Sequence, residues 1–340
     1  IISSGDESHK KMISIEFSEN SAVRTIHEES FRDSQIESFS IPENLMELKD
    51  GWCFNTDKLT KIVISPLNDR FKYIENKYLL GKSDNQSDDF DVLLFARRDI
   101  EEAQISSNIK IISSCAFNKC KKLTKVEIQM NSKLETIKEN AFSNTKITQI
   151  SIPSSVSKIC PCAFYWCKQL TNIEIPTDSN LQTIAECAFS YTNITQISIP
   201  SNVSKISGHA FEHCKQLSRV EIPSNSNLQT IGKYAFSYTN ITQISIPSNV
   251  SKISGHAFEH CEQLSRVEIP SSSNLQTIDK YAFSYTNITQ IYIPSNVSKI
   301  GALAFESCKQ LSRVEIPSNS NLQTIGESSF ESTNITQLSI

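Results

Sequence analysis

The chain repeats itself at a fixed period, and this constrains its fold more than any other feature. An Ala-Phe pair recurs through most of the sequence, and its steps alternate between 25 residues (117 to 142) and 22 residues (142 to 164). The true period is therefore 47 residues, divided into two unequal half-repeats. The marker phenylalanines, the last in a Ser-Phe variant, are Phe117, Phe142, Phe164, Phe189, Phe211, Phe236, Phe258, Phe283, Phe305 and Phe330. Residues 201–247 and 248–294 differ only at Lys215/Glu262, Asn225/Ser272, Gly232/Asp279 and Ser245/Tyr292.

The first third of the chain follows the same rule once an insertion is allowed. Phe31 and Phe54 mark two earlier half-repeats, and Leu79 stands where the next marker is expected. The extra residues fall within 80–99, where a polar stretch separates two apolar runs. We interpret 80–99 as a β-hairpin that protrudes from a single continuous domain, 1–340, of about thirteen half-repeats, or rungs.

Each rung carries alternating apolar and polar residues that end in proline. The pattern is L-x-x-V-x-I-P at 217–223 and I-x-x-I-x-I-P at 194–200. Such alternation is typical of a strand with one buried face, and proline ends the strand because it has no N–H to donate. No rung of 22–25 residues buries its apolar face alone, so neighbouring rungs must stack, about 4.8 Å apart, as a parallel sheet. A helical turn is expected around each Ala-Phe pair.

The repeated string L-x-x-V-x-I-P-S-x-x-x-x-I-x-x-x-A-F-x-x-C resembles the BspA-like leucine-rich repeat family, in its TpLRR subclass. The version NITQISIPSNVSKISGHAFEHC is most similar to the protist members. This resemblance implies a leucine-rich-repeat solenoid of mixed α/β class, mostly β, with a parallel sheet on one face and short strands and helical turns on the other. It also implies a cell-surface or secreted protein that binds or adheres, without catalytic residues.

Composition argues against several other classes. The 33 Lys+Arg and 37 Asp+Glu residues give a formal charge of −4, which is unlike a nucleic-acid-binding surface. The longest apolar runs are too short to span a bilayer. With 8 glycines and no phosphate-binding or nucleophile motif, the sequence predicts no enzyme and no cofactor.

The two ends carry a further expectation. The chain begins at Ile1 and stops after an apolar stretch, Leu338–Ile340, so both ends look cut from something longer. Open strand edges invite pairing with another chain, and terminal rungs normally need polar caps. We therefore expect either self-association through the uncapped C-terminal edge or stability only as part of a longer array.

Half of the cysteines form one column. Cysteines in this column lie two rungs apart, beyond the reach of a disulfide, so we expect small buried thiols: Cys120, Cys167, Cys214, Cys261 and Cys308. Of the others, Cys162 and Cys187 precede adjacent markers by two residues, and their spacing leaves a disulfide open. Cysteine spacing and the two H-A-F-E-H segments suggest a metal site only weakly, and we predict none.

Histidine and tyrosine alternate in two further columns, two residues before and two residues after each marker. Their rings could stack every 5 Å or so and stiffen the solenoid, or present an exposed aromatic strip to a protein or glycan. The candidate binding residues are Trp166, Tyr191, His209, His213, Tyr234, Tyr238, His256, His260, Tyr281 and Tyr285.

A second candidate binding site is the inserted hairpin, because loops on rigid scaffolds often carry function. Its acidic residues are Asp84, Asp88, Asp89 and Asp91. The outward residues of the strands form a polar lattice of Arg/Glu pairs with a single aromatic, Tyr292. Asn-x-Ser/Thr motifs, which are glycosylation acceptors in a secreted chain, occur at Asn85, Asn193, Asn202, Asn240, Asn249, Asn287, Asn296 and Asn334.

These observations predict a non-enzymatic surface module that binds protein or glycan ligands on host cells or matrix. Near-identical copies offer many equal sites, whereas catalysis needs one constellation held within about 0.5 Å. The alternative is an intracellular protein–protein scaffold, for which unpaired cysteines in a reducing compartment would be natural.

Overall fold

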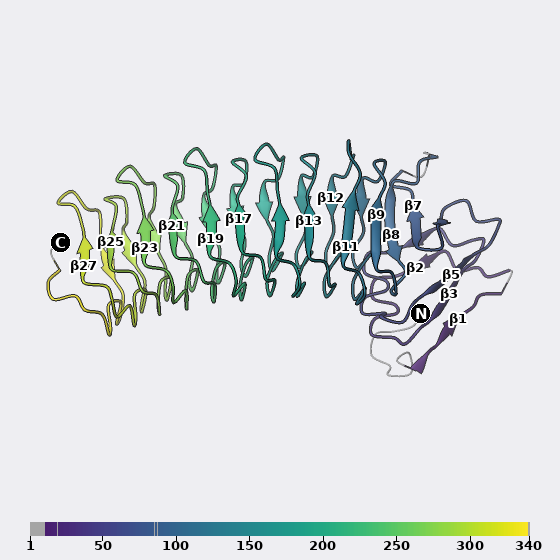
Figure 1. The fold of residues 1–340 in the computed structure, drawn as a ribbon, viewed down its shortest axis with the longest axis horizontal. Coiled ribbons are helices and arrows are strands. Elements are labelled where there is room, and N and C mark those ends of the chain that lie inside the picture. Colours follow the sequence, from purple (N-terminus) through teal and green to yellow (C-terminus); the bar gives the residue numbers. More distant parts are fainter. Residues whose placement is uncertain (1–10, 19, 85, 87, 339–340) are drawn as a thin grey trace. The chain divides into compact units, whose positions relative to one another are not determined.

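The computed structural model describes residues 11–18, 20–84, 86 and 88–338. The chain divides into two compact units, Ile1–Gln169 and Leu170–Ile340, each treated by itself below. Figure 1 shows that both are built from short strands joined by turns, and the described residues contain no helix. That all the rungs form a single domain remains a prediction.

In the second unit every rung repeats the same three segments. A first strand is followed by a loop that begins near a proline and leads to a short second strand, and a run of turns around the marker Phe comes last. The first strands bury their central residue and expose its neighbours, as the alternating sequence predicts. They are β15 (Asn172–Glu174), β17 (Gln196–Ser198), β19 (Arg219–Glu221), β21 (Gln243–Ser245), β23 (Arg266–Glu268), β25 (Gln290–Tyr292) and β27 (Arg313–Glu315).

The second strands stack into one parallel ladder, in which each isoleucine lies over the next, as Ile206 lies over Ile231. They are β16 (Thr183–Ile184), β18 (Lys205–Ile206), β20 (Thr230–Ile231), β22 (Lys252–Ile253), β24 (Thr277–Ile278), β26 (Lys299–Ile300) and β28 (Thr324–Ile325). The first strands behave differently, because they hydrogen-bond only in pairs: β17 with β19, β21 with β23, and β25 with β27.

The predicted helical turn around Ala-Phe is wrong. His209 and His213 both have φ of 57°, in the left-handed region, so a right-handed helix is interrupted on each side of Phe211. Their amides donate to the next rung, at Lys233 O (2.8 Å) and Ser237 O (2.9 Å), instead of to a carbonyl four residues earlier. Bonding between rungs therefore replaces bonding within a helix.

The interior of each rung is filled by the marker Phe and the residue three positions later. Phe211 and Phe236 stack with ring centroids 5.2 Å apart and an angle of 6° between the ring planes, and Phe236 and Phe258 repeat this at 5.4 Å. Cys214 donates from Sγ to Phe189 O (3.1 Å) and lies 3.3 Å from Thr192 Oγ1. Cysteine and threonine therefore alternate as small buried groups that bond the rungs together.

The first unit contains the same segments in its later part. Its ladder of second strands is β8 (Val92–Ala96), β10 (Ile111–Ile112), β12 (Thr136–Ile137) and β14 (Lys158–Ile159). Its first strands include β9 (Glu102–Ile105), paired with β11 (Lys125–Ile128), and β13 (Gln149–Ser151). Earlier in the chain, β1 (Ser14–Ile15), β3 (Ser38–Ile41) and β5 (Lys61–Ile64) form a parallel sheet, and β2 (Thr25–Ile26) pairs with β4 (Glu47–Leu48).

The insertion lies within the ladder. Strand β6 (Lys72–Ile74) pairs antiparallel with β7 (Tyr78–Gly81), which pairs antiparallel with β8, and β8 then pairs parallel with β10. Because β7 is wholly buried, the strands of the hairpin do not protrude as predicted. In the connector between β7 and β8 the described residues Ser83, Asp84, Gln86, Asp88 and Asp89 are exposed, because polar side chains need no cover.

The aromatic core of the first unit departs from the column pattern near its N-terminal end. Trp52 is 2% exposed, whereas Phe54, predicted as a buried marker, is only partly buried. Trp52 packs edge-on against Phe31 (6.0 Å between ring centroids) and at a tilt against Phe39 (5.1 Å). Gly51 and Asn55, the left-handed residues of this rung, flank Cys53 and not Phe54, so Cys53 holds the marker slot and Trp52 the alanine slot. Phe54 lies one residue past the marker, and Arg32 lies over its ring.

A buried arginine joins the insertion to its neighbours. Arg98 is 3% exposed and lies two residues after the end of β8. Its guanidinium donates to Ala116 O (2.8 Å), Cys115 O (3.1 Å) and Thr56 O (3.1 Å), and Nη2 lies 3.2 Å from Cys53 Sγ. Carbonyl oxygens and a thiol thus surround this charge and replace its hydration.

The predicted C-terminal strand, Leu338–Ile340, lies largely outside the described residues. The last strand described is β28, and both of its residues are exposed. A search of the described residues found no helix long and apolar enough to cross a membrane.

Candidate binding surfaces

The histidine and tyrosine rings form two stacked columns, and this stacking, one of the two alternatives drawn from the sequence, is confirmed. In the first ring column, His209, Tyr234, His256 and Tyr281 lie 4.4–4.9 Å apart, centroid to centroid. The second ring column has spacings of 4.4–4.6 Å and consists of Tyr191, His213, Tyr238, His260 and Tyr285. Identical slots in parallel rungs place like rings one rung apart, so contact between ring faces follows from the repeat.

All the ring residues have left-handed backbones, with φ between 55° and 61° in both columns from His209 to Tyr285. For residues other than glycine, this conformation costs of order 1 kcal/mol each. Stacked rings and the amide bonds between rungs offset that strain. The ring columns therefore have a structural role whatever they bind.

The two ring columns differ in exposure. In the second ring column, Tyr238 and Tyr285 remain 37% and 39% exposed, whereas every ring residue of the first column from His209 to Tyr281 is only partly exposed. Ring faces are covered by their neighbours, so the second column presents ring edges and hydroxyl groups to solvent. Trp166 holds the same slot in the first unit; it is 40% exposed, and Lys168 Nζ lies 4.6 Å from its ring centroid.

Carboxylates accompany the first ring column. His209 Nδ1 lies 3.0 Å from Glu212 Oε2, and His256 Nδ1 lies 3.1 Å from Glu259 Oε2. In the second column, His213 Nδ1 is buried without a hydrogen-bond partner among the described residues, whereas His260 Nδ1 has Glu262 at 3.7 Å. Burial lowers the pKa of His213; Glu212 opposes this effect and Lys215 adds to it.

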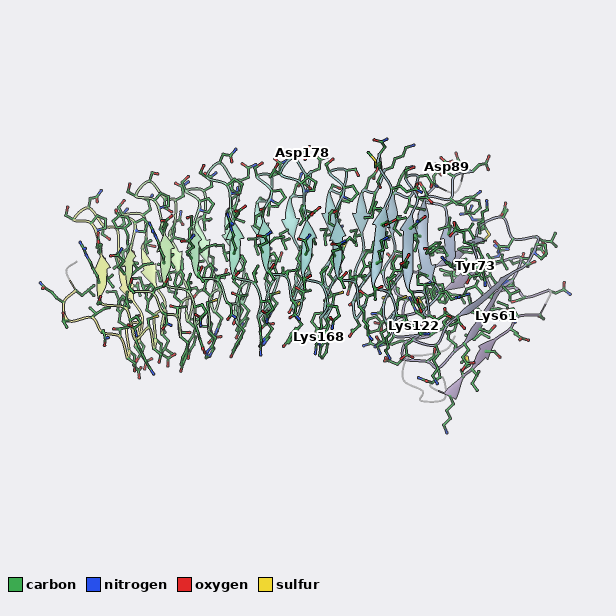
Figure 2. All side chains as sticks on the ribbon, in the orientation of Figure 1. Lys61, Tyr73, Asp89, Lys122, Lys168 and Asp178 are labelled. Carbon is green, nitrogen blue, oxygen red and sulfur yellow. The ribbon has the colours of Figure 1, made fainter. Side chains whose placement is uncertain are left out.

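The connector between β7 and β8 separates its aspartates into two kinds. Asp84, Asp88 and Asp89 are exposed, and Figure 2 shows Asp89 at the outer edge of the first unit. Asp91 is buried instead: it accepts from Ser83 N (2.8 Å) and Ser83 Oγ (2.7 Å), and it pairs with Lys110 (2.9 Å). Asp91 therefore closes the loop, and its pKa is lowered because these hydrogen bonds outweigh the burial that opposes them.

The polar lattice on the first strands pairs its own charges, as the sequence suggests. Arg266 Nη2 lies 2.6 Å from Glu268 Oε1, and Arg313 Nε lies 3.0 Å from Glu315 Oε1. Where serine stands on the preceding strand it adds a hydrogen bond, as Ser245 Oγ does to Glu268 Oε2 (2.7 Å).

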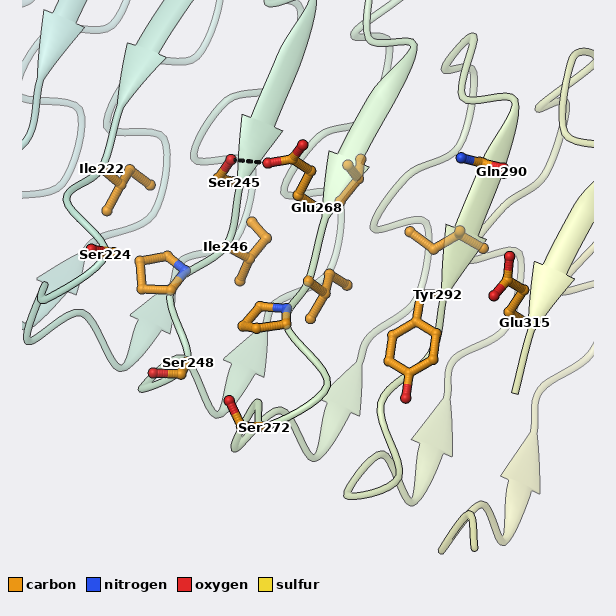
Figure 3. A pocket seen from close by; sticks show the side chains of 15 residues that line it. Ile222, Ser224, Ser245, Ile246, Ser248, Glu268, Ser272, Gln290, Tyr292 and Glu315 are labelled. Carbon is orange, nitrogen blue, oxygen red and sulfur yellow. Dashed lines mark hydrogen bonds between the residues drawn. The ribbon is translucent and has the colours of Figure 1, made fainter. Parts of the chain in front are cut away.

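A groove of about 770 Å³ crosses this lattice (Figure 3). It lies over β21, β23, β25 and β27, and so spans the gap between two hydrogen-bonded strand pairs. Its side chains include Ile246, Pro247, Glu268, Tyr292 and Glu315. Figure 3 shows the Tyr292 ring between Glu315 on one side and Ser272 on the other. The sequence singled out Tyr292 as the one aromatic of the face but did not predict a groove; the Ser245/Tyr292 difference between copies was the available signal.

The acceptor asparagines, except Asn85, which lies outside the described residues, are exposed. Asn202, Asn249 and Asn296 donate from Nδ2 to the carbonyls of Ser179, Ser226 and Ser273. In these three Asn-x-Ser motifs the asparagine therefore stabilises a turn, which accounts for its recurrence.

The column cysteines Cys120, Cys167, Cys214, Cys261 and Cys308 are buried, unpaired thiols. Burial raises their pKa values, to about 12 for Cys214 and Cys261. Within the described part of the chain, no three His, Cys, Asp or Glu side chains come together as a metal site.

Stacked parallel rungs with a buried Phe column define the class of protein: a leucine-rich-repeat β-solenoid of about thirteen rungs. Extended surfaces built from such rungs characteristically serve binding. The model of the BspA type leucine-rich repeat region matches residues 6–86, 90–218 and 229–340, in 6 copies. The chain belongs to this family.

Several solved structures are similar to the chain. A leucine-rich repeat protein from Bacteroides ovatus is 20% identical; the match covers 96% of this chain and 86% of that one, with a TM-score of 0.47. A leucine-rich cell surface protein from Faecalibacterium prausnitzii is 19% identical over 92% of this chain and 91% of that one (TM-score 0.45). The Treponema pallidum leucine-rich repeat protein is 19% identical over 62% and 64% (TM-score 0.31). No curated protein matches.

Proposed function

We propose that the chain is a non-enzymatic binding module of a cell-surface or secreted protein, which attaches to protein or glycan ligands on host cells or matrix. The observation that carries the proposal is the second ring column, in which Tyr238 and Tyr285, two rungs apart, stay exposed at their edges. A row of equivalent contacts, each weak, gives strong attachment to a repetitive ligand through avidity. The surface location follows from what the family resemblance implies.

The connector is a second contact region within the same function. Its exposed aspartates Asp84, Asp88 and Asp89 occur once, whereas the ring edges repeat, so the connector suits a selective contact and the rings suit an avid one.

The test is an adhesion assay on host cells and matrix proteins with two variants of the whole chain. Tyr238→Ala/Tyr285→Ala removes two exposed ring edges, and Asp84→Asn/Asp88→Asn/Asp89→Asn removes the charge of the connector without shortening it. We expect the first to weaken binding at least tenfold on a dense surface and the second to narrow the set of bound ligands. Lys122→Ala, on an exposed residue of the first unit, is the matched control. Unchanged binding in both variants would contradict these two contact regions.

An intracellular scaffold is the second candidate, favoured by the five buried thiols of the cysteine column. Antibody labelling of intact and permeabilised cells separates the two. Labelling of intact cells supports the surface module, and labelling only after permeabilisation supports the scaffold.

A further inference from the structure

Near-identical copies make each difference between them informative. Three equivalent positions on the first strands hold Ser198, Ser245 and Tyr292, and each pairs in the same register with a glutamate: Glu221, Glu268 and Glu315. A groove of about 690 Å³ that includes Ser198 and Glu221 repeats the site without the ring. Only the third copy places an aromatic side chain there.

The substitution of serine by tyrosine also changes the glutamate. Ser198 Oγ donates to Glu221 Oε2 at 2.9 Å, and Ser245 Oγ donates to Glu268 Oε2 at 2.7 Å. Tyr292 has no hydroxyl at that position, so among the described residues Glu315 keeps only its ion pair with Arg313, through Oε1. The third copy therefore presents a carboxylate oxygen with unused acceptor capacity beside an aromatic ring.

The groove offers little net charge to a ligand. Its two charged side chains, Glu268 and Glu315, are each paired with an arginine of the same strand, and every other lining residue is uncharged. A cationic or anionic ligand would gain little here, because one member of each pair repels it. An uncharged ligand with both apolar and hydrogen-bonding surface is the better match.

The remaining walls fit such a ligand. Ile222 and Pro270 supply apolar surface, and the Gln290 amide and the Ser272 hydroxyl supply donors and acceptors. The volume falls within the range of about 300–1,000 Å³ typical of small-ligand sites. Two of the four differences between residues 201–247 and 248–294, Ser272 and Tyr292, line this groove.

We propose that the Tyr292 groove binds a neutral oligosaccharide, with a sugar face against the Tyr292 ring and sugar hydroxyls donating to Glu315 Oε2. The proposal rests on the binding function proposed above and narrows it to one ligand class and one place. It also differs from the ring columns, whose ring faces are already covered by their neighbours and present only edges.

The first experiment measures binding of the whole chain to an array of neutral hexose and N-acetylhexosamine oligosaccharides, each paired with its sialylated or sulfated form. A Lys/Arg-containing peptide is the third arm. We expect neutral members to bind and Tyr292→Ser to reduce their affinity at least tenfold. Glu315→Gln should reduce it several-fold, because an amide accepts hydrogen bonds more weakly than a carboxylate. Binding only of charged glycans or of the peptide, or of no array member, would overturn the proposal.

The repeat supplies the control. Tyr292→Ser only restores the residue of the other copies, so loss of folding is not expected, and a melting curve verifies it. Exchanging both groove positions (Asn225→Ser, Ser245→Tyr, Ser272→Asn, Tyr292→Ser) moves the site one period along the chain and should restore binding. In the exchanged chain the new ring at position 245 pairs in register with Glu268. If the exchange fails to restore binding, a tyrosine beside its strand-paired glutamate does not form the site.

The same variants separate this inference from the proposed function. If Tyr292→Ser leaves glycan binding intact while the ring-edge variant abolishes adhesion, the groove is wrong and the binding function stands. If wild-type protein binds glycans through the groove but no host surface, the host-surface function is wrong and the groove stands.

Discussion

The two units stabilise their rungs through different kinds of contact. In the second unit each slot contacts the same slot of the next rung, so equivalent contacts repeated many times stabilise the whole: Phe211 on Phe236, His213 on Tyr238, Thr192 on Cys214. In the first unit the insertion breaks the repeat, and a single residue, Arg98, bonds Thr56, Cys115 and Ala116 together. Regular repetition distributes stability over many equal contacts, whereas an irregularity concentrates it in one.

The largest expected effect comes from emptying one slot of the regular region. Phe236→Ala removes a ring that is fully buried and stacked on both sides, and should cost about 3–5 kcal/mol in the free energy of unfolding. Denaturant titration measures it. Phe330→Ala, on a half-buried ring at the end of the stack, is the control and should cost clearly less. Equal losses would mean that the column is not a continuous core.

Removing the single bonding residue should cost nearly as much. Arg98→Met keeps much of the side-chain volume but leaves Thr56 O without its donor and takes one of two donors from Ala116 O and Cys115 O, a loss of about 3 kcal/mol. Arg97→Met, which removes a partly exposed ion pair with Asp99, should cost less than about 1 kcal/mol. Similar stabilities of the two variants would show that the insertion does not depend on Arg98.

High pH should weaken the regular region through its thiols. Burial raises the pKa of Cys214 to about 12 from an ordinary value of 9.0, so the folded chain holds a proton that the unfolded chain releases. The contribution is complete below pH 9 and is lost as the pH rises toward 12, at up to about 1.4 kcal/mol per pH unit for each such thiol. Cys214→Thr introduces the residue that alternate rungs hold in this slot. The melting temperature of this variant should fall less steeply than that of the wild type as the pH rises from 8.5 to 11. Parallel pH profiles for the two proteins would contradict a buried, protonated thiol.

The smallest effect distinguishes two nearly identical copies. Lys215→Glu gives His213 the neighbour that His260 has in Glu262, and should raise the pKa of His213 because a repulsive cation is replaced by a carboxylate. A folded-state pKa below the unfolded value means that this histidine favours folding above about pH 6.5 and loses that contribution as the pH falls. We expect the stability change to stay below about 0.5 kcal/mol, so the imidazole signals in an NMR titration are the measurement. A His213 titration that does not move would exclude Lys215 as one of the causes.

Much of the fold was predictable because the repeat carries it. Period, strand alternation and proline positions predicted the rungs, and equal slots one rung apart predicted the stacked rings of His213, Tyr238 and His260. The helical turn was predicted wrongly, because nothing in an Ala-Phe pair reveals that the flanking residues adopt a left-handed backbone to bond the next rung. The marker slot near Phe54 was placed one residue late, because a Phe was expected in the slot that Cys53 holds between the left-handed Gly51 and Asn55.

The candidate sites, too, were predictable from the sequence in some respects and not in others. By itself the sequence determined which residues recur and therefore which side chains form columns, because a fixed period places equal slots at equal positions in every rung. Only the tertiary structure decided that the ring columns expose edges and not faces, that Asp91 closes a loop while Asp84 and Asp89 face solvent, and that Tyr292 leaves Glu315 without a serine partner. The exposure of a side chain and its hydrogen bonds depend on the residues of the neighbouring rungs that pack against it. Those residues are distant in sequence, so the order of residues within one rung does not identify them.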